Sequence, residues 1–168
     1  MKRKLVLPVV CLVVLMLTGQ ALADNSLETA EKLFAAQEYK EAIGHLKTIT
    51  KENPSSLGGW LLMGKCYTAL GKEKKAVKAY TEAIQISPDH EEANFLLGMN
   101  YSLLEAHVNA IEAFKRVIEI NPENAQAHFS LGVSYDQIAR LTDAFEQYKI
   151  LRTLDPKLAD ELRSIIMD

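Results

Sequence analysis

The fold is decided by residues 60–89, which read WLLMGKCYTALGKEKKAVKAYTEAIQISPD. Each half of this stretch spaces its apolar and small residues three or four apart, as one face of a helix requires. Gly71 stands in the polar break between the halves, where a glycine can take the left-handed conformation that ends a helix. Pro88 disfavours helix at the residue before it. The stretch therefore predicts two antiparallel helices joined by a short turn.

The same pattern recurs along the chain at a fixed period. After residue 23 the prolines follow one another at intervals of 34 residues, at Pro54, Pro88, Pro122 and Pro156. Aligned on this period, the chain forms four units at about 23–56, 57–90, 91–124 and 125–156, which indicates stacked helical repeats. Small residues recur where two helices must approach closely, and large residues fill the space beside them. The small column is Ala30, Gly64, Gly98 and Gly132, and the large one is Leu46, Tyr80, Phe114 and Tyr148.

Residues 60–89 resemble the tetratricopeptide repeat family. The family's Trp, Leu-Gly, Tyr, Gly, Ala, aromatic, Ala and Pro signature stands here as Trp60, Met63-Gly64, Tyr67, Gly71, Ala76, Tyr80, Ala83 and Pro88. The resemblance extends over about 23–156, with Asn94 and His128 in the tryptophan column. It departs most in the first unit, where Ser26 and Ala30 replace the tryptophan and the glycine. The resemblance implies an all-α fold, a right-handed α-solenoid of four antiparallel helix pairs.

Two further features concern the turns and the C-terminal end. The column of Gly71 holds Gln37, Glu105 and Ala139 in the other units. If these residues are left-handed, each costs about 1 kcal/mol relative to an unstrained turn.

Residues 157–168 carry an apolar stripe, which predicts a capping helix over the open face of the last repeat. A partner-docking tail is the alternative. The stripe consists of Leu158, Leu162, Ile165 and Ile166.

The first residues differ in character from the rest. Basic residues at positions 2–4 precede an apolar run over residues 5–17, and small residues follow at Ala21 and Ala23. This order predicts a signal peptide, residues 1–23, that is cleaved after Ala23. The alternative is an anchor in the inner membrane, although the apolar run is shorter than the roughly 20 residues that span a bilayer. We therefore expect a periplasmic or secreted protein, with membrane contact only if the leader is retained.

Charge and motifs exclude several classes of function. Without the leader, 22 acidic residues face 16 basic ones, so we expect no nucleic-acid partner. Motifs for phosphate loops, metal sites or nucleophile elbows are missing from the sequence, which predicts no cofactor, no metal, no small-molecule substrate and no enzyme. Cys66 becomes the lone thiol once Cys11 is removed. We expect it to be a partly buried spacer; a redox-sensitive thiol and a catalytic nucleophile are the alternatives.

The family resemblance implies a concave surface formed by the first helix of each unit. Apolar side chains outside the core stripe are typical of interaction surfaces, so we expect a groove for a peptide or helix. The alternative is that these side chains pack against the adjoining repeat. Some family members hold a partner's C-terminal carboxylate with a clamp of Lys, Asn and Arg residues in these columns. This chain has Glu31, Met99 and Val133 there, so we do not expect it to bind a carboxylate in this way. The predicted groove residues are Leu27, Phe34, Leu61, Lys65, Phe95, Met99, Phe129 and Val133.

Together, the resemblance and the leader imply a non-catalytic scaffold for protein–protein interaction outside the cytoplasm. Such a protein would act as an adapter or as a chaperone-like assembly factor, with a protein or peptide ligand from an envelope complex. Two alternatives remain: an enzyme or redox factor that uses Cys66, and a structural subunit that associates with itself through apolar end faces.

Overall fold

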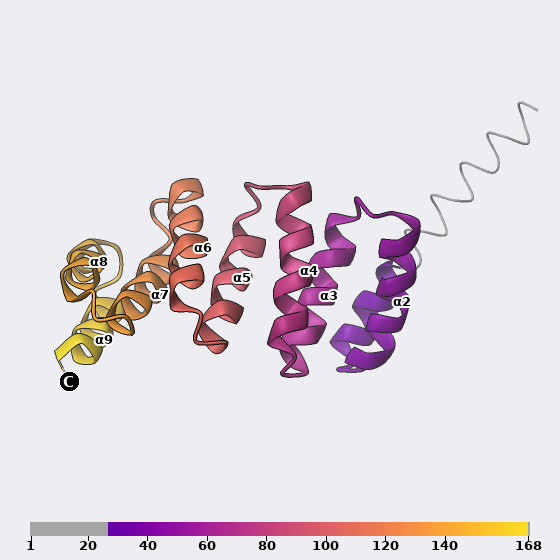
Figure 1. The fold of residues 1–168 in the computed structure, drawn as a ribbon, viewed down its shortest axis with the longest axis horizontal. Helices are drawn as coiled ribbons and strands as arrows, with labels where there is room; N and C mark the ends of the chain where they lie inside the picture. Colours follow the sequence, from indigo (N-terminus) through magenta and orange to yellow (C-terminus); the bar gives the residue numbers. More distant parts are fainter. Residues whose placement is uncertain (1–26, 168) are drawn as a thin grey trace, which may run out of the picture.

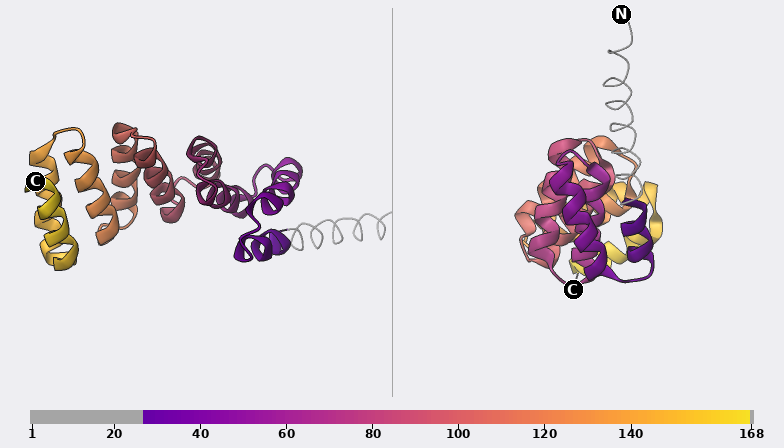
Figure 2. Two further views of the ribbon diagram at one scale, coloured as in Figure 1. Left: turned by 90° about the horizontal axis from the view of Figure 1, so that it is seen from below. Right: turned by 90° about the vertical axis from the view of Figure 1, so that its right-hand side faces the viewer.

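The computed structural model describes residues 27–167, and within them every regular element is a helix. The predicted signal peptide lies outside the described residues. Helical residues 27–35 come first, and the later helices follow in the order α2 Tyr39–Glu52, α3 Leu57–Ala69, α4 Glu73–Ile86, α5 Glu91–Leu103, α6 His107–Ile120, α7 Ala125–Asp136, α8 Leu141–Leu154 and α9 Pro156–Met167. They stand side by side in an elongated row, with residues 27–35 and α2 at one end and α8 and α9 at the other (Figures 1 and 2). The all-α solenoid predicted from the sequence is confirmed.

Each helix packs mainly against its neighbours in the chain. Helices α3 and α4, α5 and α6, and α7 and α8 form the closest pairs, and α4 against α5 and α6 against α7 join one pair to the next. Their first helices begin at Leu57, Glu91 and Ala125, 34 residues apart. The connections from α4 to α5 and from α6 to α7 lie along one edge of the row, the upper edge of Figure 1.

The glycines of the small column provide room for one large side chain each. A Cβ atom on Gly98 would lie 2.7 Å from the ring of Phe114, and a Cβ atom on Gly64 would overlap the ring of Tyr80. Tyr80 and Phe114 are completely buried. This close approach explains why glycine is present inside a helix, where it costs about 1 kcal/mol relative to alanine.

The last unit fills this space differently from its predecessors. A Cβ atom on Gly132 would lie 2.5 Å from Leu162 of α9, so Leu162 takes the place that the column assigns to Tyr148. Leu162 is fully buried, whereas Tyr148 is only half-buried. Helix α9 reaches this position because it packs against both α7 and α8. The capping helix therefore completes the core of the last repeat.

Three different side chains in the tryptophan column make the same hydrogen bond. Trp60 Nε1 donates to the carbonyl of Pro54 at 2.8 Å, and Asn94 Nδ2 donates to the carbonyl of Pro88 at 3.0 Å. His128 Nε2 lies 2.9 Å from the carbonyl of Pro122 and must donate to it, since a carbonyl oxygen can only accept. The column thus preserves an N–H group that satisfies the proline carbonyl where one helix pair joins the next.

The turns inside the helix pairs adopt the strained conformation that their column predicts. Gly71 has φ +64°, and Gln37, Glu105 and Ala139 have φ +64°, +57° and +56°. The residue that follows each left-handed residue donates its backbone N–H to a carbonyl in the last turns of the first helix, that of Leu33, Tyr67, Tyr101 or Tyr135. For example, Lys72 donates to Tyr67 at 2.9 Å. This closes the helix in a Schellman turn, in which a left-handed residue is required.

Polar side chains join the two pairs α5–α6 and α7–α8. The Glu91 carboxylate accepts hydrogen bonds from Asn121 Nδ2 at 3.0 Å and from Asn124 Nδ2 at 2.6 Å. Both asparagines belong to the α6–α7 connection. In the same region Arg116 of α6 forms an ion pair with Asp89, just before α5. These contacts fix the start of α5 to the start of α7.

Candidate functional site

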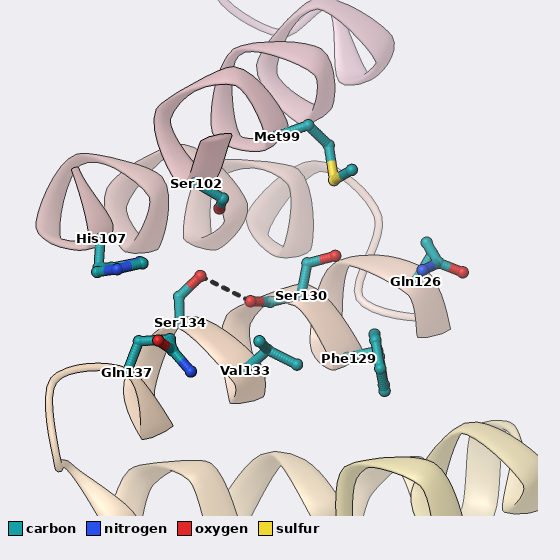
Figure 3. Close-up of a pocket in the computed structure, with 9 residues that line it drawn as sticks. All are labelled: Met99, Ser102, His107, Gln126, Phe129, Ser130, Val133, Ser134 and Gln137. Carbon is teal, nitrogen blue, oxygen red and sulfur yellow. Dashed lines mark hydrogen bonds between the residues drawn. The ribbon is translucent and has the colours of Figure 1, made fainter. Parts of the chain in front are cut away.

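A pocket of about 360 Å³ opens between α5, the start of α6, and α7. Figure 3 shows Met99 and Ser102 of α5 and His107 of α6 on one side of it, across from α7. Phe129 and Val133 of α7 are the other apolar lining residues. The other lining residues, all on α7 or just after it, are uncharged and polar: Gln126, Ser130, Ser134 and Gln137.

Packing explains why Met99 faces the solvent. The neighbouring Gly98 has the face of its Cα against the ring of Phe114. Consecutive helical residues project about 100° apart, so the side chain of Met99 is directed away from that contact. The side chain of Met99 is 40% exposed, which makes it one of the large apolar side chains least covered by the fold. Methionine adapts its shape to a partner more easily than other apolar residues. This wall of the pocket is therefore accessible and deformable.

Of the eight residues that the sequence predicts for the groove, the structure brings three together in this pocket: Met99, Phe129 and Val133. The other five lie elsewhere along the first helices. Leu27 and Phe34 pack against the core of the first two pairs, and Leu61 packs against the cluster around Tyr80. The Phe95 ring lies 5.7 Å from the Phe114 ring. Lys65 forms an ion pair with Glu92 of α5 at 2.7 Å.

Sequence reasoning missed the polar lining of the pocket. The prediction considered only the first helix of each unit, whereas His107 is the first residue of the second helix α6 and reaches the pocket from the turn. Ser102 could have been found, because its row on the first helices is polar in three of the four units, as Thr68, Ser102 and Asp136.

Two of the three serine hydroxyl groups in the pocket have already used their hydrogen atoms. Ser102 Oγ donates to the carbonyl of Gly98 at 3.1 Å, and Ser134 Oγ donates to the carbonyl of Ser130 at 2.7 Å. A hydroxyl group has one donor and two acceptor positions. Both serines therefore present acceptor lone pairs to any ligand in the pocket.

Cys66 is completely buried, so the expectation of a partly buried spacer was wrong. Its burial raises the pKa of the thiol to about 11. Since the thiolate is the reactive form, this environment makes Cys66 a poor nucleophile. Cys66 belongs to a core cluster that includes Ala42 and Leu46 of the preceding repeat, and its column mates Asn100 and Ser134 are buried as well.

A buried polar network occupies the interior near Cys66. Thr68 Oγ1 donates to Asn100 Oδ1 at 3.0 Å, and Asn100 Nδ2 donates to the carbonyl of Leu96 at 2.8 Å. The hydroxyl of Tyr80 lies 3.3 Å from the same Thr68 oxygen. Burial is the main cause that raises the pKa of Tyr80 to about 12. The network joins α3, α4 and α5, and it encloses Asn100.

Residues 27–167 contain neither a metal-ligating cluster nor a membrane-spanning helix. No three His, Cys, Asp or Glu side chains in this range are grouped so that they could hold a metal ion. None of the described helices has the length and apolarity needed to cross a membrane.

Two stretches of the chain match known families. Residues 14–83 match the family described as anaphase-promoting complex, cyclosome, subunit 3, and residues 107–138 match the family described as TPR repeat. Together with the geometry above, these matches support a tetratricopeptide-repeat protein.

Curated relatives match over part of the chain. Superkiller complex protein 3 of Homo sapiens is 31% identical over 65 residues, which is 39% of this chain and 4% of the relative. Cytochrome c-type biogenesis protein CcmH of Escherichia coli (strain K12) is 31% identical over 74 residues, 44% of this chain and 21% of the relative. The chain therefore spans only a small part of the relatives that it matches.

Solved structures match over most of the chain. MamA residues 41-end from Desulfovibrio magneticus RS-1 superimpose with a TM-score of 0.75 at 20% identity, covering 86% of this chain and 93% of that one. YrrB, described as a TPR protein with an unusual peptide-binding site, gives a TM-score of 0.73 at 18% identity, covering 85% and 84%. At these identities the likeness shows the fold, a tetratricopeptide-repeat solenoid.

Proposed function

We propose that this protein is a non-catalytic scaffold that holds a peptide or helix of a partner protein against its first helices, outside the cytoplasm. The pocket between α5, α6 and α7 carries this proposal, because it combines an exposed methionine with half-buried Phe129 and Val133. Side chains of these types are common anchors at protein interfaces. Leu27, Phe34, Leu61 and Phe95 contribute mainly to packing between helices, so they support the surface more than they contact the ligand.

The wider family supports the same role. YrrB is described as having a peptide-binding site, and CcmH is described as a biogenesis protein. An adapter or assembly factor of an envelope complex fits both the fold and the predicted leader. The burial of Cys66 argues against the alternative of a thiol enzyme.

Crosslinking in the native cell tests the binding role. A photo-reactive amino acid replaces Met99 in one strain and Val108 in another, because Val108 is 64% exposed and does not line the pocket. We expect a covalent adduct with a distinct partner from position 99 and none from position 108. If both positions give the same adducts, or if position 99 gives none, the pocket is not the binding surface.

Location requires a separate test. We expect the protein isolated from the soluble extracytoplasmic fraction to begin at Asp24 by N-terminal sequencing. An intact leader in the membrane fraction would instead support the anchor over residues 5–17. Recovery of the whole chain from the cytoplasm would overturn the location.

A further inference from the structure

We propose that the pocket between α5, α6 and α7 selects a peptide segment in which an apolar side chain is flanked by lysine or arginine. This inference rests on the proposed function and names the class of peptide that the pocket accepts. It follows from three properties of the described residues: the size of the pocket, the direction of its hydrogen bonds and the charge around it.

The size and lining of the pocket suit one apolar side chain. Its volume is about 360 Å³, and it contains no charged lining residue. An apolar side chain that enters it leaves water and contacts Met99, Phe129 and Val133. Removal of a side chain the size of leucine or phenylalanine from water favours binding. A charged side chain at this point would lose its hydration without gaining an ionic partner.

The polar rim offers acceptors to ligands that donate hydrogen bonds, alongside the donors of Ser130, His107 and the glutamine amide nitrogens. Ser102 and Ser134 have used their hydrogen atoms inside the helices, so their free positions only accept. The amide groups of Gln126 and Gln137 can also accept through their oxygen atoms. Backbone N–H groups and the ammonium or guanidinium groups of basic side chains are the donors that a peptide offers.

The excess of acidic residues around the pocket also favours a basic ligand. Residues 87–168 contain 14 aspartates and glutamates against 7 lysines and arginines, whereas residues 24–86 contain 8 against 9. The pocket thus lies in the acidic half of the solenoid. Asp136 stands beside the lining residue Gln137 and is half-buried. Within residues 27–167 its carboxylate has no ion pair, in contrast to Glu92, which Lys65 neutralises. A basic residue next to the apolar anchor would pair with Asp136.

Peptide binding to the full chain tests the inference directly. The probe is a fluorescent synthetic peptide in which a central leucine is flanked by lysines. Two matched peptides replace either the leucine by serine or the lysines by glutamates. We expect each change to weaken binding at least about tenfold, and we expect the lysine peptide to bind less tightly as salt rises. Equal binding of the lysine and glutamate peptides would overturn the proposed selectivity.

Variants locate the binding site. Met99→Lys should weaken the lysine peptide at least about tenfold, while Leu103→Lys on the same helix should not, because Leu103 is 59% exposed and lies outside the pocket lining. Met99→Leu should retain binding, which shows that the fold survives change at this position. Asp136→Lys should weaken the lysine peptide and strengthen the glutamate peptide. If Asp136→Lys changes both peptides equally, the charge argument is wrong.

The two proposals can fail separately. If position 99 crosslinks to a native partner but the lysine peptide binds no better than its matched controls, the scaffold role stands and the selectivity is overturned. If the lysine peptide binds in the expected way but the native partner attaches elsewhere, the proposed function of this pocket is overturned, although the chemistry of the pocket is supported.

Discussion

Leu162 of α9 fills the space in front of Gly132 of α7, where the two preceding repeats each place an aromatic ring from their own second helix. The C-terminal helix therefore supplies a core residue of the fourth repeat. Removal of this side chain should affect the whole C-terminal end of the solenoid, because α7, α8 and α9 share one core cluster around Leu162.

We expect Leu162→Ala to lower the free energy of unfolding by about 2–5 kcal/mol, the usual cost of a cavity at a fully buried leucine. Urea denaturation followed by circular dichroism measures this change. Met167→Ala is the matched control on the same helix, since Met167 is 70% exposed, and it should cost less than about 0.5 kcal/mol. Equal effects of the two changes would show that α9 does not complete the core.

The left-handed turns offer sites for stabilisation. Gln37, Glu105 and Ala139 have positive φ angles, which strain any residue that carries a Cβ atom. We expect replacement of each by glycine to raise the free energy of unfolding by roughly 0.5–1 kcal/mol, after the greater freedom of glycine in the unfolded chain is included. Gly71→Ala should have the opposite sign. Thermal unfolding of the four variants checks both directions, and a loss of stability in Ala139→Gly would contradict the turn geometry.

Positions in the tryptophan column should tolerate side chains that can donate a hydrogen bond to the proline carbonyl. They should not tolerate side chains of similar size that have no donor. Asn94 is almost completely buried, and its amide satisfies the carbonyl of Pro88. We expect Asn94→Leu to cost about 0.5–1.5 kcal/mol, the usual net contribution of a hydrogen bond, because the partly buried bond to the Pro88 carbonyl is lost. Asn94→His should be much milder, since His128 makes the same bond in the next repeat. Chemical denaturation of the two variants measures the difference, and similar losses would show that the hydrogen bond is not the reason for the residue choice.

Stability should fall at alkaline pH. Burial raises the pKa of the Cys66 thiol from 9.0 to about 11 and that of Tyr80 from 10.0 to about 12. The folded state therefore holds both protons more tightly than the unfolded chain does. The contribution of Cys66 is complete below about pH 9 and is lost as the pH rises toward 11.

Urea unfolding at a series of pH values measures this fall. We expect Cys66→Ser to move its onset upward, toward the range in which Tyr80 begins to titrate. A separate labelling experiment at neutral pH tests the burial of Cys66. A thiol reagent should label the unfolded chain quickly and the folded chain slowly. Rapid labelling of the folded chain would reopen the case for a reactive thiol.

Much of the fold follows from the period of the sequence. The spacing of the prolines predicts the helix pairs, and the small column predicts the contacts of Gly64 and Gly98. The place of Leu162 could not be predicted in the same way. The 34-residue alignment assigns it to the tryptophan column, whereas α9 packs out of register and uses it in place of an aromatic residue. A column shows which residues are equivalent only while the repeat geometry is maintained.

The candidate site was predictable only in part. Met99, Phe129 and Val133 could be selected because they lie beside the core stripe on the first helices. His107 could not, because it enters from a turn whose direction depends on the left-handed Glu105. Asn94 and His128 looked like departures from the family pattern, since a one-letter column does not show that both carry an N–H group to the same carbonyl.

The carboxylate of Glu91 has a consequence for how a ligand would be received. Its hydrogen bonds to Asn121 and Asn124 hold the starts of α5 and α7 together, at the edge where α6 connects to α7. A peptide that enters between these two helices cannot spread them apart unless those bonds break. The pocket is therefore preorganised: its width is set before the ligand arrives, and little conformational entropy of the scaffold has to be lost on binding.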